Sequence, residues 1–469
     1  MAMLLIEQEF EVRAAHNCYG LLDRFRDGLQ RAIGGAAKPI RFAVTASTEE
    51  LFQCEVGILS NGGSRSRLVP DLFELRPRSI EDQSSFNAIM IVPTGVGAAV
   101  GGHAGDAAPA AQLLAQACDT LITHPNVINA SDIGELPENG LYVEGSILSR
   151  FMLGTIGLHV VRANRVLVVV EPHPARTFVH DTINAVNGAR ATYGLDCPEI
   201  VILESPYKMR ARFTSQGTAA GRVENLLPLV EMLEDRTGSF DAVALASLVD
   251  LPDHLQQEYF TANEECVNPW GGVEAMLTHA ISGLFNVPSA HAPMMESVEV
   301  ANMDFGVVDP RKAAEMISLT FFNSVLKGLQ RSPGIVTDAE TMKHPSVLTA
   351  ENISVLIQPD KCLGLPTLAA LEQGIPVIAV RKNTTVMRND LDALPWRAGQ
   401  LIHVEDYVEA AGVMLAMKSG LSLDSVRRPL RPVAVVGDLC PEREHSPDGD
   451  DQFTSLVPAA LPTQSQPPR

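Results

Sequence analysis

The chain has 469 residues, of which 46% are hydrophobic and 20% are charged, and this composition excludes a coiled coil, a collagen and a solvating tail protein. Its 36 Lys and Arg residues stand against 56 Asp and Glu residues, which gives a formal net charge of −20. Because this charge would repel a phosphate backbone or an anionic lipid surface, we expect neither a nucleic-acid partner nor a membrane partner.

The N-terminal residues lack the pattern of a secretory signal, since charge appears already at Glu7 and Glu9. No apolar run approaches the roughly 20 residues that a membrane helix needs. The seven cysteines include no CxxC pair, which is typical of reduced thiols and argues against a zinc ribbon. The sequence therefore predicts a cytoplasmic protein.

Short apolar runs alternate with helical patterns from about residue 40 to about residue 418. The predicted strands are 40–45, 55–59, 88–92, 120–123, 141–144, 166–170, 200–203, 242–246, 353–357 and 376–380. The predicted helices are 14–32, 107–118, 179–193, 223–235, 272–284, 310–330, 367–373 and 404–418. Continuously apolar strands are typical of parallel sheets that are covered on both faces, so the sequence predicts an α/β fold of mostly parallel sheets with flanking helices.

The length predicts two Rossmann-like lobes around a crevice. We assign residues 1–250 to an N-terminal lobe with a glycine-rich loop and residues 251–420 to a C-terminal lobe. Residues 421–469 are rich in proline and polar side chains. Such a segment buries too little apolar surface to offset its chain entropy, so we predict a disordered tail without catalytic residues.

A glycine-rich loop follows the predicted strand 88–92 and leads into an alanine-rich helix. It lacks the Lys-Ser/Thr of a Walker A loop and does not match GxGxxG. Glycines let the backbone approach a ligand, and amides at a helix start can cradle an anion. The predicted ligand contacts are Thr94, Gly95, Gly97, Gly101, Gly102 and His103. Asp106 is either a catalytic carboxylate or the cap of the helix, and a tight turn without a ligand is the alternative for the loop.

Polar side chains follow the predicted strand 120–123 directly, at His124, Asn126 and Asn129. The carboxyl ends of parallel strands are where open α/β sheets hold their ligands. We therefore expect the three side chains to meet the glycine-rich loop at one sheet edge, with His124 in proton transfer. A histidine that merely caps the strand is the alternative.

A basic segment interrupts the acidic chain between Lys208 and Arg222. Hydroxyls, glycines and arginines there precede a helix predicted to begin near Arg222, which is a suitable setting for a phosphate or a carboxylate. The predicted anion contacts are Arg210, Arg212, Ser215, Thr218 and Arg222. A surface loop with solvated arginines is the alternative.

A third concentration of polar residues surrounds the predicted helix 272–284. Glu274 and Thr278 share a helix face, and His291 follows in a Pro-Ser-Ala-His-Ala-Pro segment. We name Glu274 and His291 as candidates for proton transfer. A catalytic thiol at Cys266 is the alternative, and because HExxH is absent we predict no metal site.

Residues 354–385 predict a strand, a polar turn, a helix, a Gly-Ile-Pro turn and a second strand. This βαβ unit resembles the donor-binding half of two-domain sugar-nucleotide transferases and epimerases. The resemblance implies substrate contacts at the carboxyl end of the second strand, at Arg381, Asn383 and Thr384.

Six segments together resemble an uncharacterised family of bacterial, cyanobacterial and plant proteins that is described as a domain of unknown function. They are PTGVGAAVGGHAGDAAP (93–109), LITHPNVINAS (121–131), NPWGGVEAMLTH (268–279), PSAHAP (288–293), GVVDPRKAAEMIS (306–318) and CLGLPTLAALEQGIPVIAVRKNTT (362–385). The resemblance covers most of residues 40–420 and implies no reaction.

The sequence predicts an enzyme that acts by acid/base chemistry, of the lyase or isomerase type, on a small anionic metabolite. A nucleotide-sugar or phosphosugar transferase or epimerase is the first alternative, and a non-enzymatic metabolite-sensing protein is the second. No cofactor is evident, and a homo-oligomer is compatible with the sequence.

Overall fold

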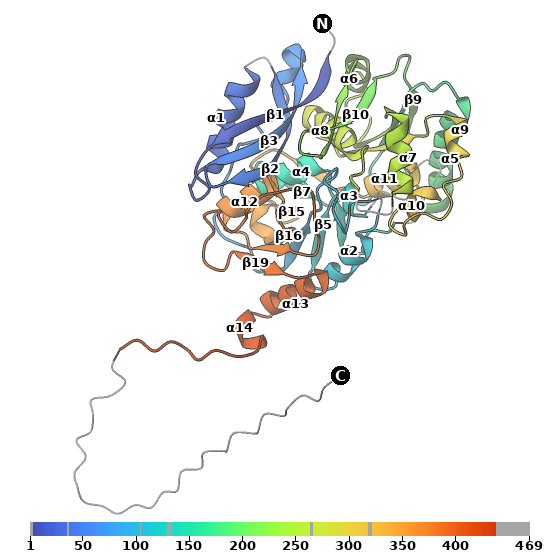
Figure 1. Cartoon of the computed structure of the whole chain (residues 1–469). Coiled ribbons are helices and arrows are strands. Elements are labelled where there is room, and N and C mark those ends of the chain that lie inside the picture. The colour runs from blue at the N-terminus through green and yellow to red at the C-terminus, as the bar shows by residue number, and fades with distance from the viewer. Residues whose placement is uncertain are drawn as a thin grey trace, which may run out of the picture. The chain divides into compact units, whose positions relative to one another are not determined.

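The computed structural model describes residues 3–34, 37–103, 105–128, 134–262, 266–317 and 321–437. The chain forms two units, Met1–Leu423 and Asp424–Arg469. All three sheets lie in the first unit, which Figure 1 shows as a mixed α/β body. The α/β class is confirmed, and the division of the body near residue 250 stays a prediction.

One sheet is wholly parallel, as the apolar runs predicted. Its strands run in the order β19 (Leu401–Val404), β18 (Val377–Val380), β16 (Ile353–Pro359), β4 (Asn87–Met90), β5 (Thr120–Thr123) and β6 (Gly140–Tyr142). All neighbours are parallel. Buried side chains of one face pack with α2 (Ala108–Ala115) and α13 (Tyr407–Lys418). Those of the other face pack with α4 (Gly145–Met152) and α12 (Leu365–Gln373).

The largest sheet is mixed, and its N-terminal half corrects the prediction of mostly parallel sheets. Its path is β17 (Leu363–Gly364), β2 (Lys38–Thr48), β3 (Leu51–Ser60), β1 (Leu4–Arg13), β11 (Ala219–Val223), β10 (Met209–Phe213), β12 (Ala242–Asp250), β8 (Val166–Val170) and β9 (Ile200–Ile202), and β13 (Ser289–Met294) pairs with β12. The pairs from β17 to β10 are antiparallel. The pairs of β12 with β10, β8 and β13 and the pair of β8 with β9 are parallel.

The antiparallel strands carry polar residues inward as well as outward, which explains the error. β1 escaped prediction because Glu7, Glu9 and Glu11 break its apolar pattern, although Glu7 is buried. β2 and β3 join through a tight turn into a hairpin, and a hairpin needs only two residues to connect antiparallel strands.

A small antiparallel sheet completes the strand content. It contains β14 (Gly334–Val336), β7 (Gly157–His159) and β15 (Val347–Leu348).

The remaining helices are α1 (Leu21–Ile33), α3 (Pro125–Ile128), α5 (Arg176–Tyr193), α6 (Leu227–Glu234), α7 (Asp253–Thr261), α8 (Gly271–Phe285), α9 (Val298–Ala301), α10 (Ala313–Met316), α11 (Phe322–Gln330) and α14 (Leu423–Val426). Short 3₁₀ turns occur at Gly63–Arg67, Thr341–Lys343 and Ala350–Asn352. The predicted helix 310–330 corresponds to two shorter helices, α10 and α11. The predicted helix 223–235 begins later, because residues 219–223 form β11.

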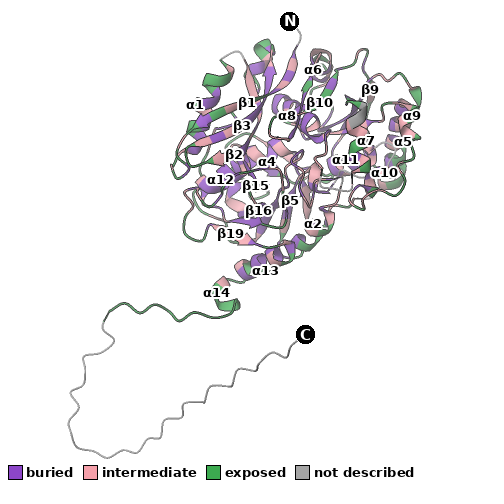
Figure 2. Ribbon diagram, in the orientation of Figure 1, coloured by how far each residue is buried: buried purple, intermediate pink, exposed green. Residues whose placement is uncertain are grey.

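Helix α8 is the central helix of the first unit. It packs against β11, β13, β2 and α4, and most of its residues are buried (Figure 2). Two glycines permit this approach: a Cβ on Gly272 would lie 2.1 Å from the Ala219 carbonyl oxygen, and one on Gly271 would lie 2.0 Å from Thr94 Oγ1. α8 therefore begins directly against β11 and the glycine-rich loop.

Within the described part of the chain, no helix combines the length and the apolar character needed to cross a membrane. Residues 424–437 are all exposed. The rest of the predicted tail, with residues 438–469, lies outside the described residues.

Candidate active site

A cavity of about 250 Å³ opens where the mixed sheet and the parallel sheet meet. Its polar wall consists of Arg41, Glu55, Thr94, His124, Asn126, Glu144, Ser146, Ser149, Thr218, Glu274, Thr278, His279, His291, Cys362 and Thr367. Six of the predicted site residues are among them: Thr94, His124, Asn126, Thr218, Glu274 and His291. The first residues of α8 and α12 also line the cavity.

The carboxyl edge of the parallel sheet supplies part of the wall. His124 follows β5, Glu144 follows β6, Thr94 lies after β4, and Cys362 lies after β16. Parallel strands end at the same edge, so four segments far apart in the chain meet there. Burial raises the pKa of the Cys362 thiol to about 12, which makes this cysteine a poor nucleophile.

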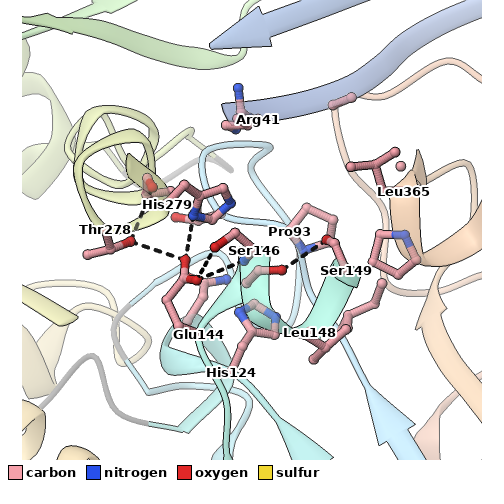
Figure 3. A pocket seen from close by; sticks show the side chains of 18 of the residues that line it. Arg41, Pro93, His124, Glu144, Ser146, Leu148, Ser149, Thr278, His279 and Leu365 are labelled. Atoms are coloured by element: carbon pink, nitrogen blue, oxygen red, sulfur yellow. Dashed lines mark hydrogen bonds and ion pairs between the residues drawn. The ribbon is translucent and has the colours of Figure 1, made fainter. Parts of the chain in front are cut away.

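Glu144 and His279 form a close pair on this wall (Figure 3). The Glu144 Oε1 atom lies 2.5 Å from His279 Nδ1 and accepts a hydrogen bond from Thr278 Oγ1 at 3.3 Å. The other carboxylate oxygen caps α4 by accepting from the Ser146 amide at 2.9 Å and from the Ser146 hydroxyl. A Cβ on Gly145 would lie 3.0 Å from His279 Cε1, so this glycine makes room for the ring.

These donors keep Glu144 ionised. Burial alone raises the pKa of the carboxyl, but His279 and the Ser146 donors outweigh burial, and the pKa lies below its ordinary value. A carboxylate only accepts hydrogen bonds, so His279 carries a proton on Nδ1. Its Nε2 atom has no hydrogen-bond partner among the described residues, and the ring lines the cavity.

Glu274 and His291 form a second pair on the cavity wall, contributed by α8 and β13. Glu274 Oε1 lies 3.0 Å from His291 Nδ1. Glu274 and Thr278 both line the cavity, which confirms that they share a helix face. The structure thus brings two of the residues predicted for proton transfer into direct contact.

Arg41 brings a guanidinium to the cavity from β2. It forms a very close ion pair with Glu7, and its Nη1 atom lies 3.9 Å from Glu55 Oε2. Thr218 donates a hydrogen bond to Glu55 Oε1. Burial lowers the pKa of Arg41 and Glu55 raises it, with a net lowering, and the group stays a cation at neutral pH because its ordinary value lies far above 7.

His124 lies on the wall but uses one ring nitrogen for the backbone. Its Nε2 atom accepts a hydrogen bond from the Val92 amide at 3.0 Å. Burial lowers the pKa of His124 to about 4, so the ring is neutral at physiological pH and carries its proton on Nδ1. His124 therefore bonds to the backbone, as the capping alternative expects, and it also lines the cavity.

Protein groups hold the glycine-rich loop at four of its backbone amides, two of which, Gly101 and His103, belong to predicted ligand contacts. Asp106 accepts from the Gly101 and His103 amides at 2.9 and 3.3 Å, and Asn383 accepts from the Val100 amide at 2.9 Å. The Ala99 amide donates to the Thr384 carbonyl at 2.9 Å. These contacts are typical of a tight turn without a ligand, which is the alternative interpretation of the loop. All four amides donate to groups of the protein.

Side chains from neighbouring segments complete this clamp on the loop. Asn126 donates to the Val92 and Gly101 carbonyls at 2.9 and 2.8 Å. Gly95 lies against β11, where its Cβ would meet that of Ala219 at 2.8 Å. Gly97 and Gly102 likewise sit where a Cβ would be tight, against Val267 and against the Ala98 carbonyl.

Asp106 does not cap α2, because the capping position belongs to Ala107. The Asp106 side chain also lines neither of the two cavities beside the glutamate–histidine pairs. Burial raises its pKa to about 6. His103 is also buried: its Nδ1 atom lies 2.9 Å from the Tyr259 hydroxyl, and burial lowers its pKa to about 4. Asn129 lies outside the described residues.

The basic segment forms a hairpin, which corrects the prediction of a helix starting near Arg222. Arg210, Arg212 and Arg222 alternate with buried residues on β10 and β11 and are exposed. Arg210 pairs with Asp250 at 3.2 Å and Arg222 with Glu224 at 3.0 Å. Ser215 bonds to Glu9 at the hairpin end, and Thr218 alone of this group reaches the cavity.

Arg381 is exposed and lies 3.5 Å from Glu405, away from the cavity wall. The βαβ unit that carries it is confirmed as β16, α12 and β18. Its contribution to the cavity comes from the first strand end and the helix start, with Cys362, Leu365 and Thr367, and not from the second strand end.

A second cavity of about 140 Å³ shares Glu274, His291 and Val325 with the first. Its other walls combine aromatic and thioether side chains, including Phe260, Trp270 and Met294, with aliphatic and polar ones. Cys266 lines neither of these two cavities. In the part of the chain that the structure describes, no group of three or more His, Cys, Asp or Glu side chains is arranged to hold a metal ion.

Comparison with known proteins shows the family of this chain. Residues 87–427 match the sequence model of the family described as "Protein of unknown function (DUF3326)". An uncharacterized lipoprotein of Synechococcus sp. is 33% identical over 344 residues, which are 72% of this chain and 92% of that protein. The chain belongs to the DUF3326 family. The family resemblance predicted from the six segments is thereby confirmed.

The DUF3326 match begins after the first three strands of the chain. Arg41 and Glu55 therefore lie outside the matched residues, although both line the cavity. The two glutamate–histidine pairs, in contrast, lie wholly within residues 87–427.

Sequence reasoning missed Glu144, His279 and Arg41. The sequence does hold a signal for Glu144. Like His124 after β5, Glu144 comes after an apolar strand, and Gly-Ser follows it. His279 is five residues from Glu274, and a comparison of residues within the helix does not show that its partner is Glu144, which lies between β6 and α4. Arg41 lies on an antiparallel strand with an inward polar face, for which the parallel pattern gave no signal.

Proposed function

We propose that this protein is an enzyme of the lyase or isomerase type that moves a proton on a small anionic metabolite. The observation that carries the proposal is the meeting of two glutamate–histidine pairs at one cavity of about 250 Å³. Each pair joins a carboxylate, which accepts protons, to an imidazole, a side chain that serves as a general acid or base, and two such pairs supply an acid and a base.

The size of the cavity limits the substrate. Cavities for drug-sized ligands span about 300–1,000 Å³, so a volume of about 250 Å³ suits a small metabolite. A nucleotide sugar would exceed it, and this favours the lyase or isomerase over the transferase.

Three features favour an anionic group on the substrate. Arg41 is a cation in the wall, and the N-terminal ends of α8 and α12 line the cavity without a side-chain cap. Helix N-termini favour negative charge. Glu55, Glu144 and Glu274 oppose it, so the anion would be held when His279 is protonated and offsets Glu144.

A thermal-shift screen of small mono-, di- and tricarboxylates tests the proposal, because a ligand that binds the native state raises the melting temperature. The screen is repeated on Glu274→Gln, on His279→Gln and on the control Glu11→Gln, which removes an exposed carboxylate on β1. We expect at least one carboxylate to stabilise the wild type and the control, and the two cavity variants to alter that shift. A hit that both cavity variants bind unchanged would place the site elsewhere.

A further inference from the structure

The two glutamate–histidine pairs face the cavity in opposite senses. In the first pair the Glu144 side chain is 2% exposed and the His279 side chain 16%. In the second pair the His291 side chain is 0% exposed and the Glu274 side chain 22%. An imidazole therefore faces the cavity from one pair and a carboxylate from the other.

A buried serine extends the second pair. Ser247 Oγ lies 2.7 Å from His291 Nε2, and the two residues come from the neighbouring parallel strands β12 and β13. Serine, histidine and glutamate thus stand in a row, as in the triad of serine hydrolases. The exposure is reversed, however, because Ser247 is fully buried and lines neither cavity, whereas Glu274 lines both.

We propose that Ser247 and His291 are positioning residues that hold the Glu274 carboxylate toward the cavity, and that Glu274 is the group that takes the proton from the substrate. Ser247 is then no nucleophile, despite its place in the row. This inference rests on the proposed function. It assigns the base to the Glu274–His291 pair and the acid to the Glu144–His279 pair.

The hydrogen bonds fix the orientation of Glu274 in either protonation state of His291. The Glu274 carboxylate accepts, so His291 Nδ1 carries a proton. When the ring is neutral, the Ser247 hydroxyl donates to Nε2. When the ring is a cation, Nε2 donates to Ser247, whose hydrogen turns to Met209 Sδ at 3.2 Å. No hydrogen bond of the row is lost in either state.

The proton balance follows from this arrangement. Glu274 Oε2 has no partner among the described residues, and it forms an O–H bond as the substrate's C–H bond breaks, while the electron pair stays on the substrate. His279, protonated on Nε2, delivers a proton to the leaving group in a lyase or to a second substrate atom in an isomerase. Solvent then restores both groups.

Histidine-selective ¹⁵N NMR on the whole chain tests the positioning role without any substrate. Assignment uses His291→Gln as the reference. We expect the Nδ1-protonated ring for His291 at neutral pH, with proton exchange slowed by burial. A neutral ring protonated on Nε2 would overturn the inference, and it would leave the metabolite screen of the proposed function untouched.

Ser247→Ala and Ser282→Ala form a matched pair of variants, because both serines are fully buried and only Ser247 contacts His291. We expect Ser247→Ala to shift the His291 nitrogen signals and to lower proton transfer on the screening hit by about 10-fold, Ser247→Thr to restore both, and Ser282→Ala to change neither. Equal effects from both alanine variants would reduce Ser247 to a packing role.

A fluorophosphonate reagent checks the remaining alternative. We expect no labelling of Ser247 in the folded protein, because the residue is buried. Stoichiometric labelling at Ser247 would identify it as a nucleophile and overturn the inference. Where Ser247→Ala fails to fold, the NMR and labelling of the wild type decide the question.

Discussion

At the scale of single residues, a glutamate–histidine pair presents a different group to the cavity according to which of its two partners is buried. Glu144 is fixed by a helix start and a hydroxyl, so its histidine faces the cavity. His291 is fixed by Ser247, so its glutamate faces the cavity. Sequence reasoning found His124 because it follows a strand, Glu274 because it shares a helix face with Thr278, and His291 because it lies in a Pro-Ser-Ala-His-Ala-Pro segment. Exposure depends on long-range packing that no local pattern encodes.

A buried carboxyl outside the cavities gives a prediction about pH. Burial raises the pKa of Glu171 from 4.5 to about 7, although the Leu248 amide donates to it at 2.8 Å. The folded state therefore holds this proton where the unfolded state has lost it, so the contribution of Glu171 to stability is present below pH 4.5 and falls as the pH rises through 7.

We expect Glu171→Gln to remove that loss. Relative to the wild type, the variant should gain about 3 kcal/mol in the free energy of unfolding above pH 7, with most of the gain developing between pH 5 and pH 8. Urea unfolding at pH 5 and at pH 8 measures this gain in the free energy of unfolding. The exposed Glu11→Gln serves as the control, and a Glu171→Gln difference that stays constant with pH would show that the carboxyl titrates normally in the fold.

At the scale of elements, apolar periodicity predicted the parallel sheet and α8 closely, since buried strands and helices leave continuous patterns in the sequence. The predicted strand 120–123 coincides with β5, and the predicted helix 272–284 differs from α8 by one residue at each end. The prediction of a loop and a helix start is wrong for the hairpin of β10 and β11, although Met209, Ala211 and Phe213 alternate with arginines in the manner of a half-buried strand.

The close approach of α8 to β11 gives a prediction at this scale. A Cβ on Gly272 would lie 2.1 Å from the backbone oxygen of Ala219, and backbone has no room to yield. We expect Gly272→Ala to lower the free energy of unfolding by about 2–3 kcal/mol. Denaturant unfolding measures the change.

Gly188→Ala is the matched control, because Gly188 lies inside α5 with open space around its Cβ position. There the alanine should stabilise the chain by about 0.5–1 kcal/mol through its better helix propensity. Equal effects of the two substitutions would contradict the tight contact between α8 and β11.

At the scale of the whole molecule, composition indicated a globular body and the alternation of apolar runs with helical patterns indicated an α/β fold, but neither showed how its parts assemble. The cavity draws on β2 and β3 at the start of the chain and on α12 near its end, so its wall is a property of the complete first unit. Strand pairing across hundreds of residues, such as β17 with β2, created that wall and lay beyond any local reading of the sequence.

The C-terminal end gives a prediction at this scale. Residues 424–437 are exposed throughout and belong to a unit separate from Met1–Leu423. We expect a chain that ends at Arg427 to keep the melting temperature of the full chain within about 1 °C, since residues 428–437 are exposed and the proline-rich, polar composition of residues 438–469 predicts little burial of apolar surface. A drop of several degrees would show that the C-terminal residues support the body.

The central claim is that Glu274 and His279 transfer protons on a bound metabolite. Incubation of a stabilising carboxylate with the protein in D₂O, followed by ¹H NMR, tests this claim most directly. We predict that one carbon-bound hydrogen of the metabolite is replaced by deuterium, and that Glu274→Gln slows the exchange by about 100-fold or more while Glu11→Gln does not. A metabolite that binds in the cavity but exchanges no hydrogen, or that exchanges equally fast with Glu274→Gln, would contradict the account.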